Sequence, residues 1–321
     1  MNQPPRAAAP LDPQMKAFLD ATTDRGTAGV DVFTADVAVL RAQVEAGRIG
    51  YAAGGPEMAR AEEFAVPGPG RLVCCRLNVP QGVPAAAPVL VLLHGGGWTW
   101  NSIHTVDRTA REYAARAGMA VLAPDYSLSP EYKFPQALNE CVAVLRWVAE
   151  HGAARGLDPS RIFVGGDSAG GNLALASALA LRDEGRRILR GCLLNYGVFD
   201  SDFGRESYRL YGDGTYYLSE RMMRFFWRNY TATSDQTTHP LAAPLRADLA
   251  GLPPLFVGAA EVDVLADESA ALAQRARAAG IVVEERVYRG MTHGFLRAVG
   301  HVEQADRCLA DGAAWMRALS G

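Results

Sequence analysis

The chain has 321 residues, of which 49% are hydrophobic and 21% charged, as is ordinary for a globular protein. Its formal net charge of -3 gives no reason to expect nucleic acid or an anionic membrane surface as a partner. No apolar run reaches the roughly 18 residues that a membrane span needs, and an N-terminal export signal is not expected because prolines and Asp12 interrupt that segment.

The five cysteines are an odd number, and no two of them form a C-x-x-C pair. We therefore interpret them as small hydrophobic residues in a reducing compartment and expect neither a disulfide framework nor a zinc site. The predicted location is the cytoplasm.

Residues 1–70 are predicted to form an N-terminal helical cap segment and a linker. One helix is expected over residues 12–21, and a second from a Thr34 cap to about Glu45, with its apolar positions on one face. Over 50–70 the composition shifts to Gly, Pro and Ala, which indicates a linker without a domain of its own.

From residue 71 onward, short apolar segments alternate with segments typical of helices. The predicted strands lie at about 71–79, 88–93, 119–126, 161–166, 191–197, 252–263 and 281–288. The predicted helices lie at about 105–117, from Pro135 onward, and at 172–184, 266–279 and 302–319. This alternation predicts an α/β fold with a mostly parallel sheet covered on both faces, formed by residues 71–200 and 248–321.

An aromatic-rich segment interrupts this alternation. Residues 199–230 hold ten of the 27 aromatic residues and are too long for an ordinary crossover. A helical excursion with its own small core is one interpretation. The other is a lid that packs with the N-terminal helices over the carboxyl ends of the strands, where open α/β sheets bind ligands. We assign residues 201–247 as a cap insertion.

The strongest motif is the serine turn between a predicted strand and a predicted helix. Gly166 and Gly170 flank Ser168 in the pattern G-x-S-x-G, which is typical of the nucleophile elbow of serine hydrolases. A sharp turn of this kind exposes the serine hydroxyl and directs the first helical N–H groups at the atom it attacks. The alternative is a serine in a Gly-rich loop that only caps a helix.

A serine nucleophile needs a histidine base and a carboxylate that orients the base. Of the six histidines, only His293 comes after the serine and lies on a loop that follows the last predicted strand, since His301 lies near a helix start. Glu261, Asp263 and Asp267 lie near the end of the preceding strand. Asp267 stands at a helix start, where its charge complements the helix dipole, so Asp263 on the loop is the predicted acid.

The glycine run after the strand at 88–93 predicts an oxyanion-binding loop. Glycines 95–97 let the backbone pass close to Ser168, so that two of their N–H groups join the N–H of Ala169 as donors. Taken alone, the run could be a tight turn.

Together these motifs resemble the hormone-sensitive-lipase-like branch of the α/β hydrolases in its GDSAG form. His94-Gly95-Gly96-Gly97 precedes Gly166-Asp167-Ser168-Ala169-Gly170, as in that family. The stretch DYSLSPEYKFPQALNE is similar to the family's Y-R-L-A-P-E…F-P-A segment, and EVDVLADES and MTHGF match its D-x-L-x-D-E and H-G-F. The YSLSP motif within this stretch is most similar to that of bacterial acetyl esterases.

The resemblance implies an α/β-hydrolase fold and a role for each matching residue. Ser168 would be the nucleophile, His293 the base and Asp263 the orienting acid. Gly96, Gly97 and Ala169 would be the oxyanion donors, and His94 would help to hold their loop. Ser127 stands where the family usually has Arg, which removes a charge near the site, and Trp98 stands where a smaller aromatic is usual.

The predicted function is that of a serine carboxylesterase that hydrolyses short-chain acyl esters through an acyl-enzyme, with no cofactor or metal. An amide or formamide hydrolase with the same triad is the alternative, and a small-molecule receptor on this fold is disfavoured by His293. The partner is a small-molecule ester, and the resemblance allows a homodimer. Trp98 and Trp100 follow the glycines and are predicted to line the substrate pocket and limit the acyl chain.

Overall fold

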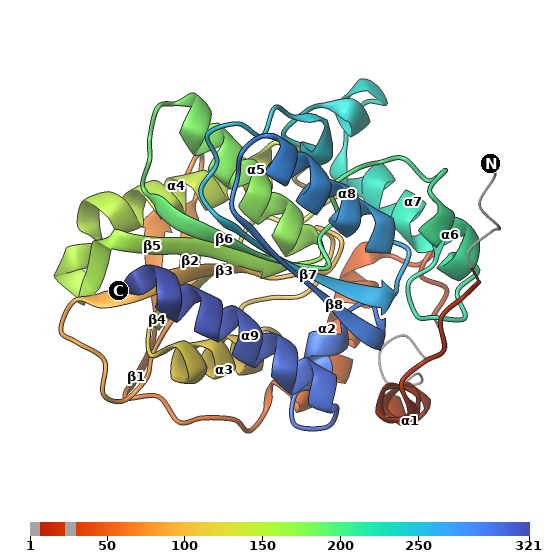
Figure 1. Ribbon diagram of the computed structural model, residues 1–321, viewed down its shortest axis with the longest axis horizontal. Coiled ribbons are helices and arrows are strands. Elements are labelled where there is room, and N and C mark those ends of the chain that lie inside the picture. The colour runs from red at the N-terminus through yellow and green to blue at the C-terminus, as the bar shows by residue number, and fades with distance from the viewer. Residues whose placement is uncertain (1–6, 23–29) are drawn as a thin grey trace.

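The computed structural model describes residues 7–22 and 30–321, and within them eight strands form one sheet (Figure 1). The strand order is β1-β2-β4-β3-β5-β6-β7-β8. The strands are β1 (Arg60–Pro67), β2 (Leu72–Val79), β3 (Ala87–Leu93), β4 (Ala120–Pro124), β5 (Leu157–Asp167), β6 (Leu189–Asn195), β7 (Leu255–Val262) and β8 (Val283–Thr292). Only β2 runs antiparallel to its neighbours β1 and β4, which confirms the prediction of a mostly parallel sheet.

Helices cover both faces of this sheet, with α4, α5 and α8 on one side and α3 and α9 on the other (Figure 1). The α-helices are α1 (Pro13–Thr22), α2 (Val37–Ala52), α3 (Asp107–Ala117), α4 (Gln136–His151), α5 (Ala169–Asp183), α6 (Glu206–Tyr211), α7 (Glu220–Tyr230), α8 (Ala266–Ala278) and α9 (Glu303–Ser320). Short 3₁₀ turns are η2 (Gly152–Arg155), η3 (Asp235–Thr238), η4 (Pro244–Arg246) and η5 (Phe295–Ala298). Every residue of β3 is buried, as its continuous apolar run predicts for a strand between two helical layers.

The expected linker over 50–70 is wrong in its second half, because β1 (Arg60–Pro67) lies there. This edge strand pairs with β2, with Phe64 opposite Cys75 and Val66 opposite Val73. Of its eight residues only Val66 is buried, so the strand carries little apolar signal of its own. Its pairing with β2, and not its composition, makes it a strand.

Helix α2 also differs from the prediction at both ends. Its N-cap is Asp36, whose side chain accepts a hydrogen bond of 2.7 Å from Ala38 N, and Thr34 is not the cap. The helix continues through Gly47 to Ala52. For α1 the prediction is confirmed to within one residue at each end. Residues 1–6 and 23–29 of the expected cap segment lie outside the described residues.

The aromatic-rich segment packs against the N-terminal elements. The ring of Phe225 in α7 meets the ring of Phe33 edge-on, with centroids 6.0 Å apart. Tyr211 and Tyr217 accept hydrogen bonds from Ala9 N (3.1 Å) and from the Arg48 guanidinium (3.0 Å). In Figure 1, α6 and α7 lie with α2 near the carboxyl ends of the parallel strands, so two segments far apart in sequence meet over the same edge of the sheet.

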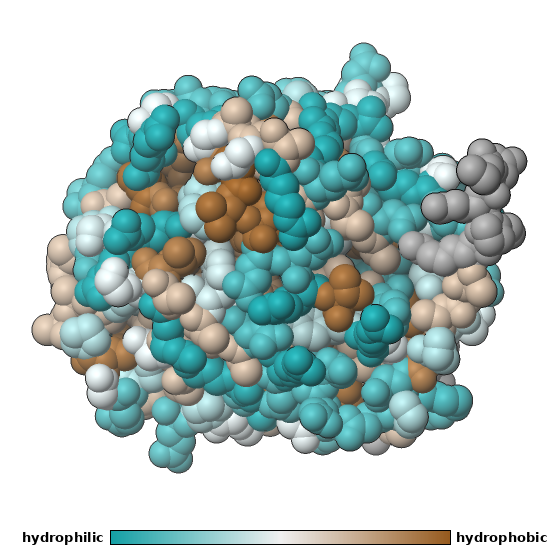
Figure 2. All heavy atoms as spheres, viewed as in Figure 1, coloured by the Kyte–Doolittle hydropathy of each residue, from teal (hydrophilic) through white to brown (hydrophobic). Residues whose placement is uncertain are grey.

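The outer surface on the side shown in Figure 2 is mostly hydrophilic, with hydrophobic residues in separate small patches. Scattered patches of this kind are normal for a protein surface. None of the helices in the described ranges combines the length and the apolar composition that crossing a membrane requires.

Candidate active site

Three side chains that the sequence singles out meet at the carboxyl edge of the sheet. His293 Nε2 lies 2.8 Å from Ser168 Oγ, and His293 Nδ1 lies 2.8 Å from Asp263 Oδ2. Because a carboxylate only accepts, Nδ1 carries the proton and Nε2 accepts from the serine hydroxyl. Ser168 is 8% exposed, His293 6% and Asp263 2%. The chain of hydrogen bonds is therefore shielded from water, while the serine can still be reached by a substrate.

Ser168 occupies a strained turn between β5 and α5. Its backbone has φ 55° and ψ -120°, a conformation that residues other than glycine rarely adopt. A side chain at Gly170 would run into the carbonyl of Leu93, so only glycine fits there. Ser168 N donates to Asn195 O (3.0 Å) and Ser168 O accepts from Val198 N (3.2 Å). These contacts fix the turn on both sides of the hydroxyl.

The three acids near the end of β7 have three different partners. Asp263 accepts from His293, whereas Asp267 accepts a hydrogen bond of 2.8 Å from Ser207 N and Glu261 one of 2.8 Å from Gly290 N. Asp267 therefore anchors the start of α6, and Glu261 anchors the loop that carries His293. Of the three predicted candidates, only Asp263 faces the imidazole.

The ionisation of His293 is set by two opposing effects. Burial of the ring would lower its pKa, but the charge of Asp263 and its hydrogen bond outweigh burial and raise the pKa above the usual value. The paired carboxylate thus stabilises the imidazolium that forms when His293 accepts a proton.

The glycine run after β3 lies beside Ser168 and borders the same cavity. Gly95 N donates to Asp167 Oδ1 (3.0 Å), and Asn101 Nδ2 donates to Gly95 O (2.9 Å). In the described part of the chain, the N–H groups of Gly96 and Gly97 have no acceptor. The N–H of Ala169 opens α5 and so has no acceptor within the helix.

His94 and Tyr126 support this loop from below. The two rings stack with centroids 4.2 Å apart, and Tyr126 OH donates to His94 O (2.7 Å). His94 Nδ1 lies 2.8 Å from Gly95 O. His94 is buried, and its contacts act on the position of the glycine backbone.

The positive charge that Ser127 lacks is supplied by Arg71, which lies far upstream in the sequence. Ser127 Oγ donates to the buried Glu140 (2.7 Å) and accepts from Arg71 (3.0 Å). The Arg71 guanidinium lies 3.9 Å from the same carboxylate. A cation therefore still stands beside Glu140, although it comes from a position 56 residues upstream of Ser127.

A cavity of about 110 Å³ opens above Ser168 and His293. One side of it is apolar and consists of Trp100, Leu218, Met222 and Phe226. The Trp100 indole packs edge-on against Phe226, with centroids 4.7 Å apart. Trp100 therefore lines the cavity that contains Ser168.

The pocket prediction for Trp98 is wrong. Its indole is fully buried and stacks on the ring of Tyr230 at 4.0 Å, with Trp227 on another side. Trp98 has a positive φ of 55°, and its side chain does not line the cavity. A position in the sequence next to the oxyanion glycines could not reveal that reversal.

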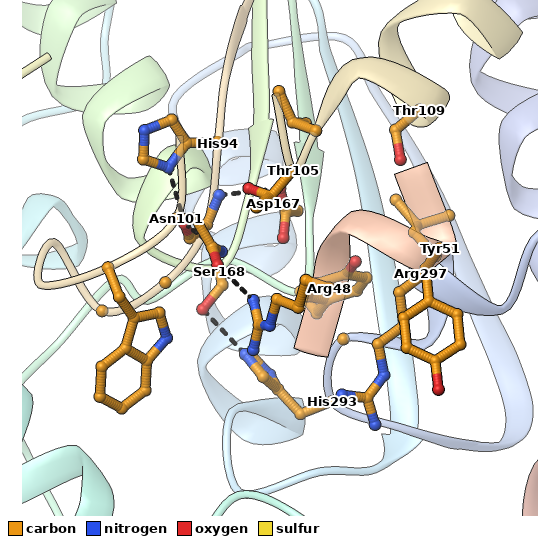
Figure 3. A pocket seen from close by; sticks show the side chains of 18 of the residues that line it. Arg48, Tyr51, His94, Asn101, Thr105, Thr109, Asp167, Ser168, His293 and Arg297 are labelled. Carbon is orange, nitrogen blue, oxygen red and sulfur yellow. Dashed lines mark hydrogen bonds between the residues drawn. The ribbon is translucent and has the colours of Figure 1, made fainter. Parts of the chain in front are cut away.

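Among the cavity-lining residues that the sequence did not mark are Arg48, Tyr217 and Arg297. Figure 3 shows the two arginines. Arg48 comes from α2 and Arg297 from η5. Arg297 follows His293 by only four residues, and its place in the histidine loop was a usable signal. Nothing in the pattern of α2 marked Arg48, because its direction depends on how α2 packs.

Comparisons with known proteins give one consistent result. A family model described as alpha/beta hydrolase fold matches residues 90–297. Carboxylesterase NlhH of Mycobacterium tuberculosis is 36% identical over 99% of each chain, and an acetyl esterase of Salmonella schwarzengrund is 37% identical over 79% of each chain. Among solved structures, a thermostable esterase from Pseudomonas putida superposes with a TM-score of 0.91 at 32% identity, covering 98% of this chain and 99% of its own.

Proposed function

The chain belongs to the hormone-sensitive-lipase-like branch of the α/β hydrolases, and on that premise we propose that it is a serine carboxylesterase acting on short-chain acyl esters. The observation that carries the proposal is the hydrogen-bonded series Ser168–His293–Asp263 at the floor of a cavity. The names of the relatives, carboxylesterase and acetyl esterase, support the same reaction class.

In this mechanism, Ser168 Oγ attacks the ester carbonyl while His293 Nε2 takes its proton. Asp263 holds the imidazole in the tautomer with Nδ1–H and stabilises the imidazolium. The developing oxyanion accepts hydrogen bonds from the N–H groups of Gly96, Gly97 and Ala169, and each such donor is typically worth about 3–4 kcal/mol. His293 then gives the proton to the leaving alcohol, and water hydrolyses the acyl-enzyme by the same steps.

The preference for short acyl chains is supported by the volume of the cavity and its apolar side. About 110 Å³ is well below the roughly 300–1,000 Å³ of pockets that hold drug-sized ligands. Trp100 and Phe226 are large, stiff side chains, and moving them costs more than an added methylene gains. We expect kcat/KM to peak at acyl chains of two to about six carbons and to fall steeply beyond about eight.

We also infer that residues 7–22 and 30–52 form a cap over the catalytic domain together with residues 201–247, and that the protein works in the cytoplasm. β1 lies in the sheet and is not part of this cap. The contacts of Phe33 with Phe225 and of Arg48 with Tyr217 support the cap. The five free cysteines are compatible with a reducing compartment. A homodimer stays a prediction.

A panel of p-nitrophenyl esters from acetate to laurate, with p-nitroacetanilide as the amide control, tests the proposal. Hydrolysis of acetate and butyrate esters that is lost in Ser168→Ala is the expected result. Hydrolysis of the anilide as fast as of the acetate ester would favour the amide hydrolase. A laurate ester hydrolysed as well as butyrate would contradict the short-chain preference.

A further inference from the structure

Two guanidinium groups point into the cavity that holds Ser168 and His293 (Figure 3). Arg48 donates to Asn101 Oδ1 (2.7 Å) and to Tyr217 OH (3.0 Å), both of them uncharged oxygens in their ordinary forms. The guanidinium of Arg297 lies 4.0 Å from the centre of the Tyr217 ring. Its Nε atom is buried without a hydrogen-bond partner. We call Arg48, Tyr217 and Arg297 the cationic wall.

A third arginine at the same cavity shows how these two differ. Arg108 also lines the cavity, but its Nε lies 2.8 Å from a Glu112 carboxylate oxygen. Within residues 7–22 and 30–321, neither Arg48 nor Arg297 has a carboxylate oxygen within 4.0 Å. The wall therefore carries positive charge that forms no ion pair with a carboxylate in the described part of the chain.

The nearby acids are already occupied by other donors. Asp167 accepts from Gly95 N (3.0 Å), and Asp263 accepts from His293 (2.8 Å). Glu45, one turn before Arg48 on α2, accepts from Ser102 Oγ (2.8 Å). These acids stabilise the oxyanion loop, the histidine and the α2 contact. The charge of Arg48 acts on Asp167, but Asp167 makes no ion pair with it within 4.0 Å.

Tyr217 reports the electrostatic potential of this wall. Burial would raise the pKa of its phenol, but the charges of Arg297 and Arg48, with a smaller contribution from His293, outweigh burial and lower it to about 7. A group that ionises so readily stands in a strongly positive environment, which favours any anion placed there.

We propose, on the basis of the esterase function above, that the preferred substrates are short esters carrying a free carboxylate, which Arg48 and Arg297 bind while Ser168 attacks the ester carbonyl. A guanidinium matches a carboxylate in shape and donates several hydrogen bonds to it. Cations that are partly removed from water are usually paired, and here a substrate carboxylate completes the pair. The small cavity limits the distance between carboxylate and ester to a few bonds.

Two substrate classes share this chemistry, and matched pairs of compounds separate them. Monoethyl succinate carries the carboxylate on the acyl side, and its neutral partner is ethyl succinamate. Acetoxyacetate carries it on the alcohol side, and its neutral partner is acetoxyacetamide. In each pair the carboxylate and the amide have nearly the same shape, so the ratio of their kcat/KM values, followed by pH-stat titration, isolates the charge.

The wild-type enzyme should favour the carboxylate in at least one pair by about tenfold or more at low ionic strength. Arg48→Gln and Arg297→Gln should each bring that ratio close to one while changing kcat/KM for the amide much less. The matched control is Arg108→Gln, because that guanidinium lines the same cavity but is neutralised by Glu112. In Arg108→Gln the ratio of kcat/KM for the carboxylate to that for the amide should stay near the wild-type value.

The outcomes are distinguishable. If both amides are hydrolysed as fast as their carboxylates, the anionic substrate class is wrong and the esterase function stands. If a carboxylate preference survives in both Arg48→Gln and Arg297→Gln, the cationic wall is not its cause and the assignment fails. If neither these compounds nor the p-nitrophenyl esters are hydrolysed, the proposed esterase function itself is wrong. Should Arg48→Gln fail to fold, Arg297→Gln decides alone, since the Arg297 side chain donates no hydrogen bond to the described part of the chain.

Discussion

The two sides of the cavity are built on different principles. On the catalytic side, Ser168, His293 and Asp263 form a closed series in which each polar group has its partner. On the cationic wall, neither Arg48 nor Arg297 has a carboxylate oxygen of the described residues within 4.0 Å. The hydrogen-bonded triad performs the same chemistry on any ester that reaches Ser168. The positive charge of the cationic wall, in contrast, favours substrates that carry a negative charge. The reaction and the selection of substrates are therefore assigned to different sides of the cavity.

The largest effect is expected from the catalytic side. Ser168→Ala should lower kcat by a factor on the order of 10⁴ or more, because no other group at the site can form the acyl-enzyme. The fold should persist, since removing one hydroxyl opens no core cavity. Burst kinetics with p-nitrophenyl acetate and far-UV circular dichroism measure the two quantities. A variant that keeps more than a few per cent of the activity would remove Ser168 from the series.

The acid of the series can be tested against a neighbour of the same type. Asp263→Asn should cost about 10⁴ in kcat, the scale expected when a triad acid becomes an amide. Asp267→Asn is the control, because Asp267 accepts from the Ser207 amide and not from His293. Its effect should appear in thermal unfolding much more than in kcat. Equal losses of kcat in the two variants would contradict the assignment of Asp263.

Substituting each of the two tryptophans by alanine distinguishes a residue that lines the cavity from one that belongs to the core. Trp100→Ala enlarges the apolar side and should raise kcat/KM for an eight-carbon acyl ester about tenfold relative to acetate. Trp98→Ala should leave the chain-length profile unchanged and instead destabilise the fold by about 3–5 kcal/mol, the usual cost of removing a buried aromatic side chain. Ester kinetics and urea unfolding of both variants check this. A longer optimum in Trp98→Ala would mean that its indole does reach the substrate.

The smallest expected effect is on the pH dependence of kcat/KM. It compares the catalytic side of the cavity directly with the cationic wall. With a neutral ester, kcat/KM should rise with pH and level off only above about 6.5, because His293 must be neutral to act as base and its pKa is raised. Asp263→Asn should move that inflection to lower pH, since the carboxylate is what raises the pKa.

A carboxylate-bearing ester should add a second inflection. Tyr217 faces Arg48 from α2, Arg297 from η5 and His293 from the loop after β8, and its pKa is lowered to about 7. Once ionised, the phenolate competes with the substrate carboxylate, so the ratio of charged to neutral ester should fall as the pH rises through about 7. Tyr217→Phe should remove this fall. A ratio independent of pH from 6 to 8 in the wild type would separate Tyr217 from substrate binding.

The sequence by itself determined the parts of the protein that depend on local geometry. Gly166 and Gly170 around Ser168 require a sharp turn between strand and helix, and that turn is present with a positive φ at the serine. The choice of Asp263 over Asp267 also followed from local position, since a helix start already explains Asp267. Alternating strands and helices predicted the parallel sheet because each apolar run needs two covering layers.

Only the tertiary structure decided the features that depend on contacts between distant segments. β1 forms because β2 offers a partner, although its own composition is that of a linker. The Trp98 indole enters the core because Tyr230, from a helix far along the chain, provides a stacking surface. Arg48 reaches the catalytic cavity because α2 packs beneath the aromatic segment, and a side chain's direction on a helix has meaning only relative to what the helix packs against.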